Sequence, residues 1–362
     1  MKCLLQFILL INGILLAHCQ VLNQEEKPLS LKEELPINLA KNSDSSKING
    51  LSFVAPPDPF PTDPMQDIVD CGANWISVIP YGYTLPLQAS VRYNQASWQW
   101  WGEKPEGVLE TIKLAHLHNI GVMLKPQVYL PGSWPGDMEF KTDEDWVKWE
   151  TSYHNYVMPF VKMADSLNVE LFCIGTEFKK SVAARSRFWE DLIKEIRAIY
   201  RGKLVYAANW NDYDQVPFWD QLDYIGINAY FPLDNGKTPS QANLLAKWKP
   251  ISAEIRAFSE RKQKKVLFTE YGYLSVDGCA GPTWELEKTV KSLPINHKAQ
   301  CEALNAIYTS FYDQDWWAGG FLWKWFPHGE GHEGYLERDY TPQGKEAMTV
   351  LKKWFKKNAQ PD

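Results

Sequence analysis

The sequence predicts an α/β fold, a single (β/α)8 (TIM) barrel, on three observations. Eight short apolar runs alternate with amphipathic stretches that have helical periodicity. The runs are nearly continuous in apolar residues, as parallel strands are when they lie between a barrel interior and a layer of helices. An open doubly wound sheet usually has a glycine-rich turn after its first strand, where this chain has APPDPFPTDP, residues 55–64.

The expected strands cover residues 49–56, 74–82, 121–130, 169–178, 203–210, 222–231, 264–273 and 318–327. Clear helical patterns cover residues 105–120, 186–202, 298–313 and 344–357. Pro105 stands at a permitted first-turn position, and Ser186 is predicted to cap the second of these helices. The connection at residues 212–221 is too short for a full helix, so we expect at most one helical turn there.

Residues 1–19 have the pattern of an export signal. One lysine precedes the mostly apolar run 4–16, which is too short to span a membrane. The tetrapeptide at 16–19, LAHC, resembles a bacterial lipobox, although His18 departs from the small residue usual before the cysteine. We therefore expect an exported protein, extracellular, periplasmic or anchored to a membrane only through a lipidated Cys19. The alternative to lipidation is simple cleavage nearby.

The composition indicates one domain and excludes one class of partner. Residues 20–47 are polar with scattered leucines and read as a leader or tether, and residues 48–358 form the expected barrel domain without an internal linker. The formal net charge is -6, and no basic patch is interleaved with aromatic residues. A nucleic acid is therefore not an expected partner.

Four cysteines follow the leader, namely Cys71, Cys173, Cys279 and Cys301. In an oxidising compartment Cys279 and Cys301 could form a disulfide, and the alternative is four buried or free thiols. No Cys/His spacing suggests zinc.

The run HGEGHEGY, residues 328–335, contains two histidines, but its glycines disfavour a helix that would present them on one face. No metal site is therefore predicted, and the run reads as a structural or substrate-side loop.

Two expected strands end on a glutamate that an aromatic residue follows, Glu177 and Glu270. In a parallel barrel the functional residues lie where the strands end and the following loops begin. Because side chains alternate along a strand, Gly175 and Cys173 should face the barrel interior if Glu177 faces the pocket. By the same argument, Glu270 should share its face with Phe268.

Two carboxyl groups across a pocket can cleave a glycosidic bond. One donates a proton to the leaving oxygen, and the other attacks the anomeric carbon or activates a water molecule. Their surroundings must raise the pKa of one and keep the other ionised. The structural alternative is that each glutamate pairs with a nearby lysine, such as Lys125 or Lys324.

The two strand-end glutamates and the aromatic last strand resemble clan A glycoside hydrolases, which are retaining (β/α)8 enzymes. Within the clan, GTEF, GINAYFP, FTEYGY, FLWKWFP and YTPQGKEA, in this order, resemble family 113, a group known for β-mannanases. The resemblance covers about residues 49–355. It implies that Glu177 is the acid/base and Glu270 the nucleophile.

The resemblance assigns further roles. Tyr230 would donate a hydrogen bond to Glu270, and Trp323 would form the floor under the sugar at the cleavage point. Many clan members place an asparagine directly before the acid/base to hold the sugar 2-hydroxyl, and here that position is Thr176. A threonine hydroxyl is shorter and lies differently, so the contact and the inference of mannose both depend on this position.

Other strand-end residues suit a sugar site. Amide, indole and ammonium groups that could bind hydroxyls, or support the residues that do, belong to Asn209, Trp210, Asn228, Lys125 and Gln127. The run ASWQWWGEKP supplies Trp98, Trp100 and Trp101, whose indoles would stack on pyranose rings if exposed. At least one or two of these three are expected to pack on the following helix instead.

We therefore predict an exported, retaining β-glycoside hydrolase that acts on a β-linked hexose polymer or oligomer, β-mannan first, without a cofactor. One alternative is the same mechanism on β-glucan or on short β-oligosaccharides. A second is a carbohydrate-binding barrel without catalysis. A third, a metal-dependent hydrolase, rests only on the HGEGHE run.

Overall fold

The computed structural model describes residues 47–86, 88–94, 98–329 and 335–357. The predicted export signal, nearly all of the leader, and Glu330 and His332 of the HGEGHE run lie outside these ranges. Among the described residues, no helix has the length and apolar character needed to cross a membrane.

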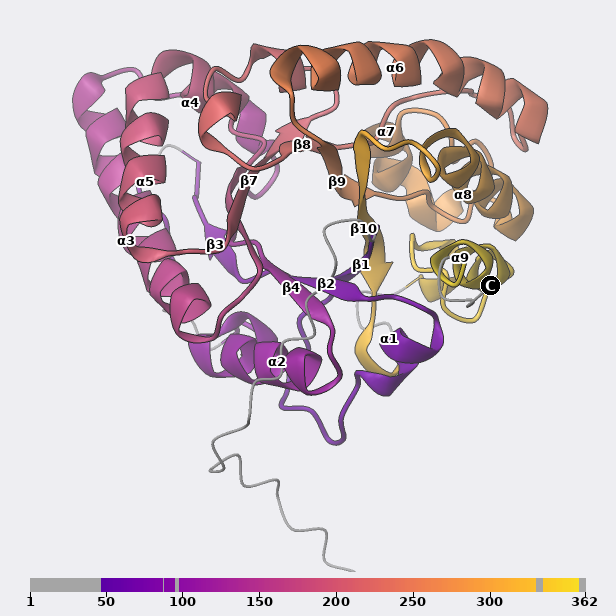
Figure 1. Ribbon diagram of the computed structural model, residues 1–362, viewed down its shortest axis with the longest axis horizontal. Helices are drawn as coiled ribbons and strands as arrows, with labels where there is room; N and C mark the ends of the chain where they lie inside the picture. Colours follow the sequence, from indigo (N-terminus) through magenta and orange to yellow (C-terminus); the bar gives the residue numbers. More distant parts are fainter. Residues whose placement is uncertain (1–46, 87, 95–97, 330–334, 358–362) are drawn as a thin grey trace, which may run out of the picture. The chain divides into compact units, whose positions relative to one another are not determined.

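Eight parallel strands close into a barrel in the order β1-β10-β9-β8-β7-β6-β4-β2, which confirms the predicted fold class (Figure 1). Each barrel strand overlaps one of the eight expected apolar runs. The strands are β1 (Ile48–Phe53), β2 (Trp75–Val78), β4 (Gly121–Leu124), β6 (Leu171–Thr176), β7 (Lys203–Asn209), β8 (Ile225–Asn228), β9 (Val266–Tyr271) and β10 (Trp317–Trp325).

Two of the expected strands are each interrupted. The runs 74–82 and 121–130 leave the barrel and continue as β3 (Tyr81–Tyr83) and β5 (Gln127–Tyr129), which form a separate parallel pair. Pro80 and Pro126 stand at the two breaks. Proline has no N–H to donate to a sheet, so neither run can stay in the barrel ladder throughout.

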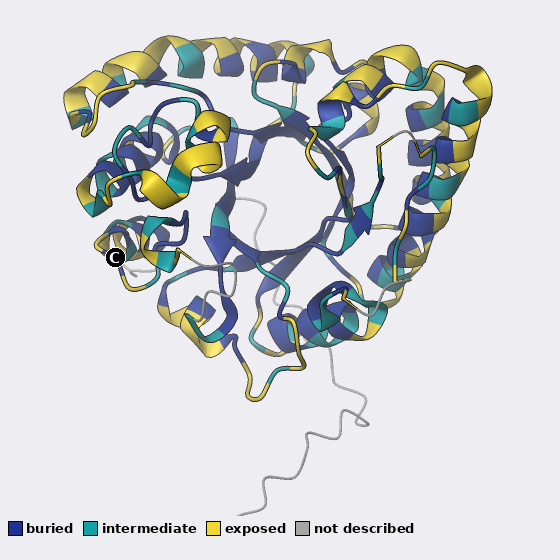
Figure 2. Ribbon diagram, turned by 180° about the vertical axis from the view of Figure 1, so that it is seen from behind, coloured by how far each residue is buried: buried dark blue, intermediate teal, exposed yellow. Residues whose placement is uncertain are grey.

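Helices surround the barrel, with buried residues toward the strands and exposed residues outward (Figure 2). They are α1 (Gln66–Asp70), α2 (Pro105–Leu117), α3 (Asp143–Ser166), α4 (Lys179–Ala184), α5 (Ser186–Ile199), α6 (Gln241–Lys262), α7 (Thr283–Leu286), α8 (His297–Phe311) and α9 (Ala347–Phe355). Helix α2 begins at Pro105 as predicted. Ser186 is the first residue of α5 rather than its cap, and no side chain caps that helix, so this prediction is wrong.

The connection between β7 and β8 contains two single 3-10 turns, Tyr213–Gln215 and Trp219–Gln221, so no full helix forms there, although one turn more than predicted is present. Within the described ranges Cys71, Cys173, Cys279 and Cys301 are free, so the disulfide considered between Cys279 and Cys301 is not formed.

Two apolar layers hold the barrel together. A small cluster fills its interior, and a larger one lies between the strands and the helices. The inner cluster comprises Ile48, Trp75, Met123, Leu171, Cys173, Val205, Ala207, Leu267, Ala318 and Phe321. Because these side chains fill the interior as a packed core, polar chemistry is confined to the mouth, where the strands end.

Candidate active site

Glu177 follows β6, and a bulge in that strand sets its direction. The pairing with β7 shifts by one residue between Cys173 and Thr176. Cys173 lies inside the barrel as predicted, but Gly175 does not, because a Cβ added there would lie 2.8 Å from the ring of Trp189 in α5. The prediction for Gly175 is wrong because a bulge interrupts strand alternation.

The backbone of Glu177 is in the left-handed region, with φ at 57°. Its N–H donates to the carbonyl of Ala207 on β7 over 2.8 Å. This conformation costs a residue other than glycine about 1–2 kcal/mol, and such strain is concentrated at functional sites. The backbone turn, rather than the strand period, directs this carboxyl group.

Glu270 also follows a bulge. Ile227 of β8 pairs with Phe268, but Asn228 pairs with Glu270, which leaves Thr269 as an extra residue on β9. Phe268 packs in the outer cluster between strands and helices. Glu270 therefore does not share its face with Phe268, and the prediction from simple alternation is wrong for the same reason as at Gly175.

Glu270 is buried and held by two groups. Lys125, wholly buried at the end of β4, forms an ion pair with Glu270 Oε1, and its Nζ also donates to Gln127 Oε1 over 3.1 Å. Tyr230 Oη donates to Glu270 Oε2 over 3.0 Å, so the expected hydrogen bond is present. Burial, together with the nearby Glu270 carboxylate, raises the pKa of Tyr230 well above its usual value, which keeps its phenol a proton donor.

Glu177 has different partners. Asn228 Nδ2 donates to Glu177 Oε1 over 2.9 Å, and Trp134 Nε1 donates to Oε2 over 2.5 Å. Asn228 is itself oriented by Thr269, whose hydroxyl donates to Asn228 Oδ1 over 2.8 Å. The extra residue of the β9 bulge therefore fixes the amide that contacts Glu177, and both strand ends are coupled through Asn228.

The two carboxyl groups have unequal surroundings. Burial, and then the charge of Glu270, raise the pKa of Glu177 to about 7, although Trp134, Asn228 and Lys125 oppose the increase. A substantial fraction of Glu177 is therefore protonated at neutral pH, while Glu270 lies against a cation. Acid-assisted attack on an acetal requires one carboxyl group that donates a proton and a second that is ionised.

Other predicted residues lie around this pair. Thr176 is buried directly before Glu177. Asn209 ends β7, pairs in register with Asn228, and accepts a hydrogen bond from the backbone N–H of Trp210. Trp323 is half-buried on β10, and its peptide bond to Lys324 is cis.

The three tryptophans after the expected second strand do not act alike. Trp98 is 62% exposed and contacts the edge of Tyr83, with ring centroids 4.8 Å apart. Trp101 packs edge-on against Phe60 at 5.4 Å, and Trp100 is half-buried. Of the three, Trp98 presents the most indole surface to solvent.

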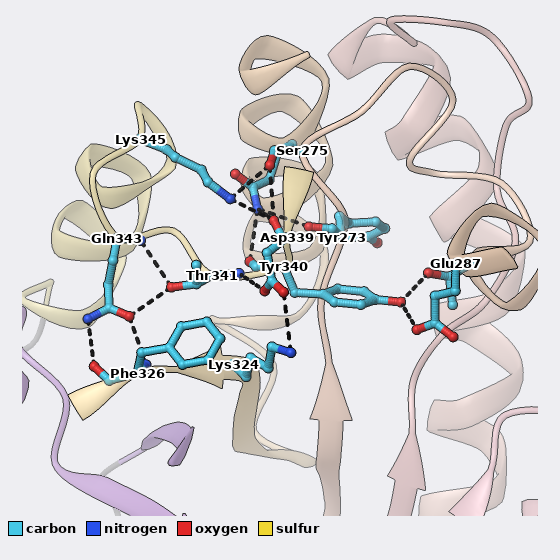
Figure 3. A network of polar contacts seen from close by, with 12 residues as sticks. Tyr273, Ser275, Glu287, Lys324, Phe326, Asp339, Tyr340, Thr341, Gln343 and Lys345 are labelled. Carbon is cyan, nitrogen blue, oxygen red and sulfur yellow. Dashed lines mark hydrogen bonds and ion pairs between the residues drawn. The ribbon is translucent and has the colours of Figure 1, made fainter. Parts of the chain in front are cut away.

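Lys324, the second lysine of the structural alternative, does not pair with either glutamate. Its Nζ lies 3.3 Å from Asp339 Oδ2, within a polar network at the end of β10 (Figure 3). In the same network Lys345 Nζ donates to Ser275 Oγ over 2.8 Å and to the Asp339 carbonyl over 2.7 Å. Gln343 bonds both the N–H and the carbonyl of Phe326, which fixes the exit of the strand.

This network extends to the candidate site through Tyr340. Its hydroxyl donates to Glu287 Oε1 and lies 2.5 Å from Thr283 Oγ1 (Figure 3). Its ring contacts Tyr230 at 6.3 Å between centroids, and Tyr230 holds Glu270. Tyr340 is the first residue of the motif YTPQGKEA, so this motif supports the site through the contact of Tyr340 with Tyr230. Sequence periodicity did not predict this role.

Metal ligation finds no support among the described residues, since no group of three or more His, Cys, Asp or Glu side chains could hold an ion there. Of the histidines and acids in the HGEGHE run, this statement covers only His328.

The sequence matches the model of Glycoside Hydrolase Family 113 over residues 59–345. No curated protein matches it significantly. Among solved structures, the family 113 β-mannanase AaManA from Alicyclobacillus acidocaldarius, in complex with ManMIm, has a TM-score of 0.74 and 24% identity, covering 86% of this chain and 97% of that one.

Two other solved structures are also similar to this chain. A complex structure of a family 113 β-1,4-mannanase has a TM-score of 0.71 at 24% identity, covering 86% of this chain and 99% of that one. A β-glucuronidase from Ruminococcus gnavus has a TM-score of 0.55 at 12% identity, covering 81% of this chain and 45% of that one. At these identities the structural likeness establishes the barrel fold.

Proposed function

Because the chain belongs to glycoside hydrolase family 113, we propose that it is a retaining β-glycoside hydrolase whose first candidate substrate is β-mannan. The observation that carries the mechanism is the unequal pair at the barrel mouth. Glu177 has a pKa raised to about 7, and Glu270 lies against Lys125 and Tyr230. The similar solved structures of family 113 are β-mannanases, which supports the choice of substrate.

The proposed reaction has two steps. Glu270 attacks the anomeric carbon while the bond to the glycosidic oxygen breaks and Glu177 gives its proton to that oxygen. Glu177, now ionised, then takes a proton from water, whose oxygen attacks the same carbon and releases Glu270. Each carboxyl group ends in its starting state, and no cofactor enters the balance.

A β-glucan with the same mechanism is the second candidate substrate. Thr176 keeps it open, because a short hydroxyl stands where many clan members have an asparagine that holds the sugar 2-hydroxyl. Mannose and glucose differ in configuration at this hydroxyl. The contact made there therefore decides between them.

Product analysis tests the proposal. β-Mannan, β-glucan and their short oligosaccharides would be incubated with the protein and with Glu177→Ala and Glu270→Ala variants. Cleavage of mannan with a retained anomer, lost in both folded variants, supports the mechanism and the substrate. Cleavage of glucan alone keeps the mechanism and overturns mannan. If nothing is cleaved but an oligosaccharide binds, the protein is a carbohydrate-binding barrel.

The raised pKa of Glu177 predicts the alkaline side of the pH–rate profile. The acid must be protonated, so kcat/KM should fall as pH rises through about 7. The Trp134 N–H stabilises the ionised carboxylate of Glu177, so Trp134→Phe should raise the pKa of Glu177. The alkaline limb of the pH–rate profile should therefore shift to higher pH by about one unit.

Trp354→Phe is the matched control for that variant. It also removes an indole N–H. The indole of Trp354, on α9, donates to Asn305 Oδ1 over 3.0 Å and contacts neither glutamate. Its pH–rate profile should coincide with that of the parent. An alkaline limb that stays in place in Trp134→Phe, or moves equally in both variants, would contradict the assignment of Glu177 as the acid.

A further inference from the structure

Two indoles stack on each other at the barrel mouth. Trp210 directly follows β7, and Trp284 belongs to α7 in the connection after β9. Their ring centroids are 5.9 Å apart and their planes differ by 15°. Trp210 also packs on Phe231 at 5.6 Å, whereas Trp284 is 40% exposed. The pair therefore has a buried side and an open side.

Trp210 lies on the Glu177 side of the mouth, since it follows β7, which pairs with β6. Trp284 belongs to the connection after β9, the strand that contains Glu270. Trp210 follows Asn209, whose register partner Asn228 donates to Glu177. The backbone N–H of Glu177 donates to Ala207 of the same strand β7. In the proposed reaction Glu177 protonates the leaving oxygen, so the sugars beyond that oxygen lie on the side of the acid. Trp210 is thus placed beside the leaving group, and Trp284 stacks on it.

Helix α7, which contains Trp284, is bound to the polar network of Figure 3 on both sides of this residue. Thr283 Oγ1, one residue before it, lies 2.5 Å from Tyr340 Oη, and Tyr340 also donates to Glu287 just after the helix. Two anchors on a four-residue helix restrict the rotation of its backbone. An exposed indole held in this way binds a flat partner at a low cost in conformational entropy.

We propose that Trp210 and Trp284 form a platform on which a pyranose of the leaving-group part of a β-linked hexose chain stacks, an inference that rests on the proposed function. A pyranose has an apolar face of C–H groups that matches an indole. The platform makes the enzyme favour chains that extend past the cleavage point over glycosides with a small leaving group. Trp98, beside Tyr83 of β3, belongs to a different part of the rim.

The test compares two substrates of the same sugar. One is a β-1,4-linked hexasaccharide, and the other is an aryl β-glycoside whose leaving group is a phenol. In Trp284→Ala the ratio of kcat/KM for the hexasaccharide to that for the aryl glycoside should fall by about tenfold, and Trp284→Phe should recover most of it. The control Leu117→Ala truncates another exposed apolar side chain, at the end of α2, and should keep the parent ratio.

An unchanged ratio in Trp284→Ala, or an equal fall in Leu117→Ala, overturns the platform while leaving the proposed function intact. If the parent cleaves neither substrate, the proposed function fails, and calorimetric binding of the hexasaccharide decides the platform separately. A Kd about tenfold weaker in Trp284→Ala than in the parent supports it. Equal affinities contradict it.

Discussion

Glu270→Ala is expected to lower kcat/KM for β-glycan hydrolysis on the order of 10⁴-fold or more, because it removes the carboxylate that is proposed to form the glycosyl bond. Azide should restore turnover of an activated aryl glycoside by entering the space that the carboxylate leaves. The product should be a glycosyl azide of inverted configuration, since the azide attacks from the nucleophile's side.

Two comparisons make that result specific. In Glu177→Ala the nucleophile remains, so azide should trap the glycosyl-enzyme and give an azide of retained configuration. Glu190→Ala, which removes an exposed glutamate of α5, should be as active as the parent. An inverted azide from the Glu177 variant, or activity of the Glu270 variant near that of the parent, contradicts the proposed roles.

Lys125→Met should lower kcat/KM by about 10²–10³-fold and destabilise the fold by about 3–5 kcal/mol, because it leaves the carboxylate of Glu270 buried without its cation. A buried carboxyl group without a cation favours its neutral form, which does not attack. Activity should therefore be lost most at low pH, and the acidic limb of the pH–rate profile should move to higher pH.

Lys324→Met provides the matched control. It also removes a buried ammonium, but one that pairs with Asp339 rather than with either glutamate. It should lower the free energy of unfolding and leave the acidic limb in place. Chemical denaturation and pH–rate profiles of both variants separate the two effects. An identical acidic limb in Lys125→Met and the parent would show that this ion pair does not hold the nucleophile ionised.

The sequence predicts the barrel well because its main signal is local. Each barrel strand is a short apolar run, and α2 begins at its proline. Pro80 and Pro126 lie inside the expected runs 74–82 and 121–130. Composition alone therefore does not show that each run divides into a barrel strand and a second strand, β3 or β5. Helices α3 and α6, which no clear sequence pattern predicted, each contain an internal proline, Pro159 and Pro250, and proline usually breaks a helix.

The direction of the two glutamates could not be predicted in detail. Strand alternation fails at Gly175 and Phe268 because each lies at a bulge, and a bulge is defined by the neighbouring strand's pairing. The left-handed backbone of Glu177 is likewise set by its contact with β7. Sequence periodicity contains no information on either.

The partners of the glutamates show a further limit. Lys125 was expected to bind sugar hydroxyls or to pair with a carboxylate, and its Nζ contacts are to Glu270 and Gln127. The structural alternative therefore holds for this lysine, and the same ion pair also serves the proposed chemistry. Trp134 was not predicted as a site residue, because its loop, PGSWPGD, has no periodic pattern. Its indole reaches Glu177 only in the folded chain.

The central claim is that Glu270 becomes covalently bound to the sugar, and trapping this adduct tests it most directly. A 2-deoxy-2-fluoro-β-glycoside of the cleaved sugar with an activated aryl leaving group accumulates the adduct, because fluorine slows both steps and the good leaving group speeds only the first. Peptide mapping by mass spectrometry should place one added glycosyl group on Glu270, with none on Glu177. A label on Glu177, or complete inhibition without any labelled peptide, would contradict the account.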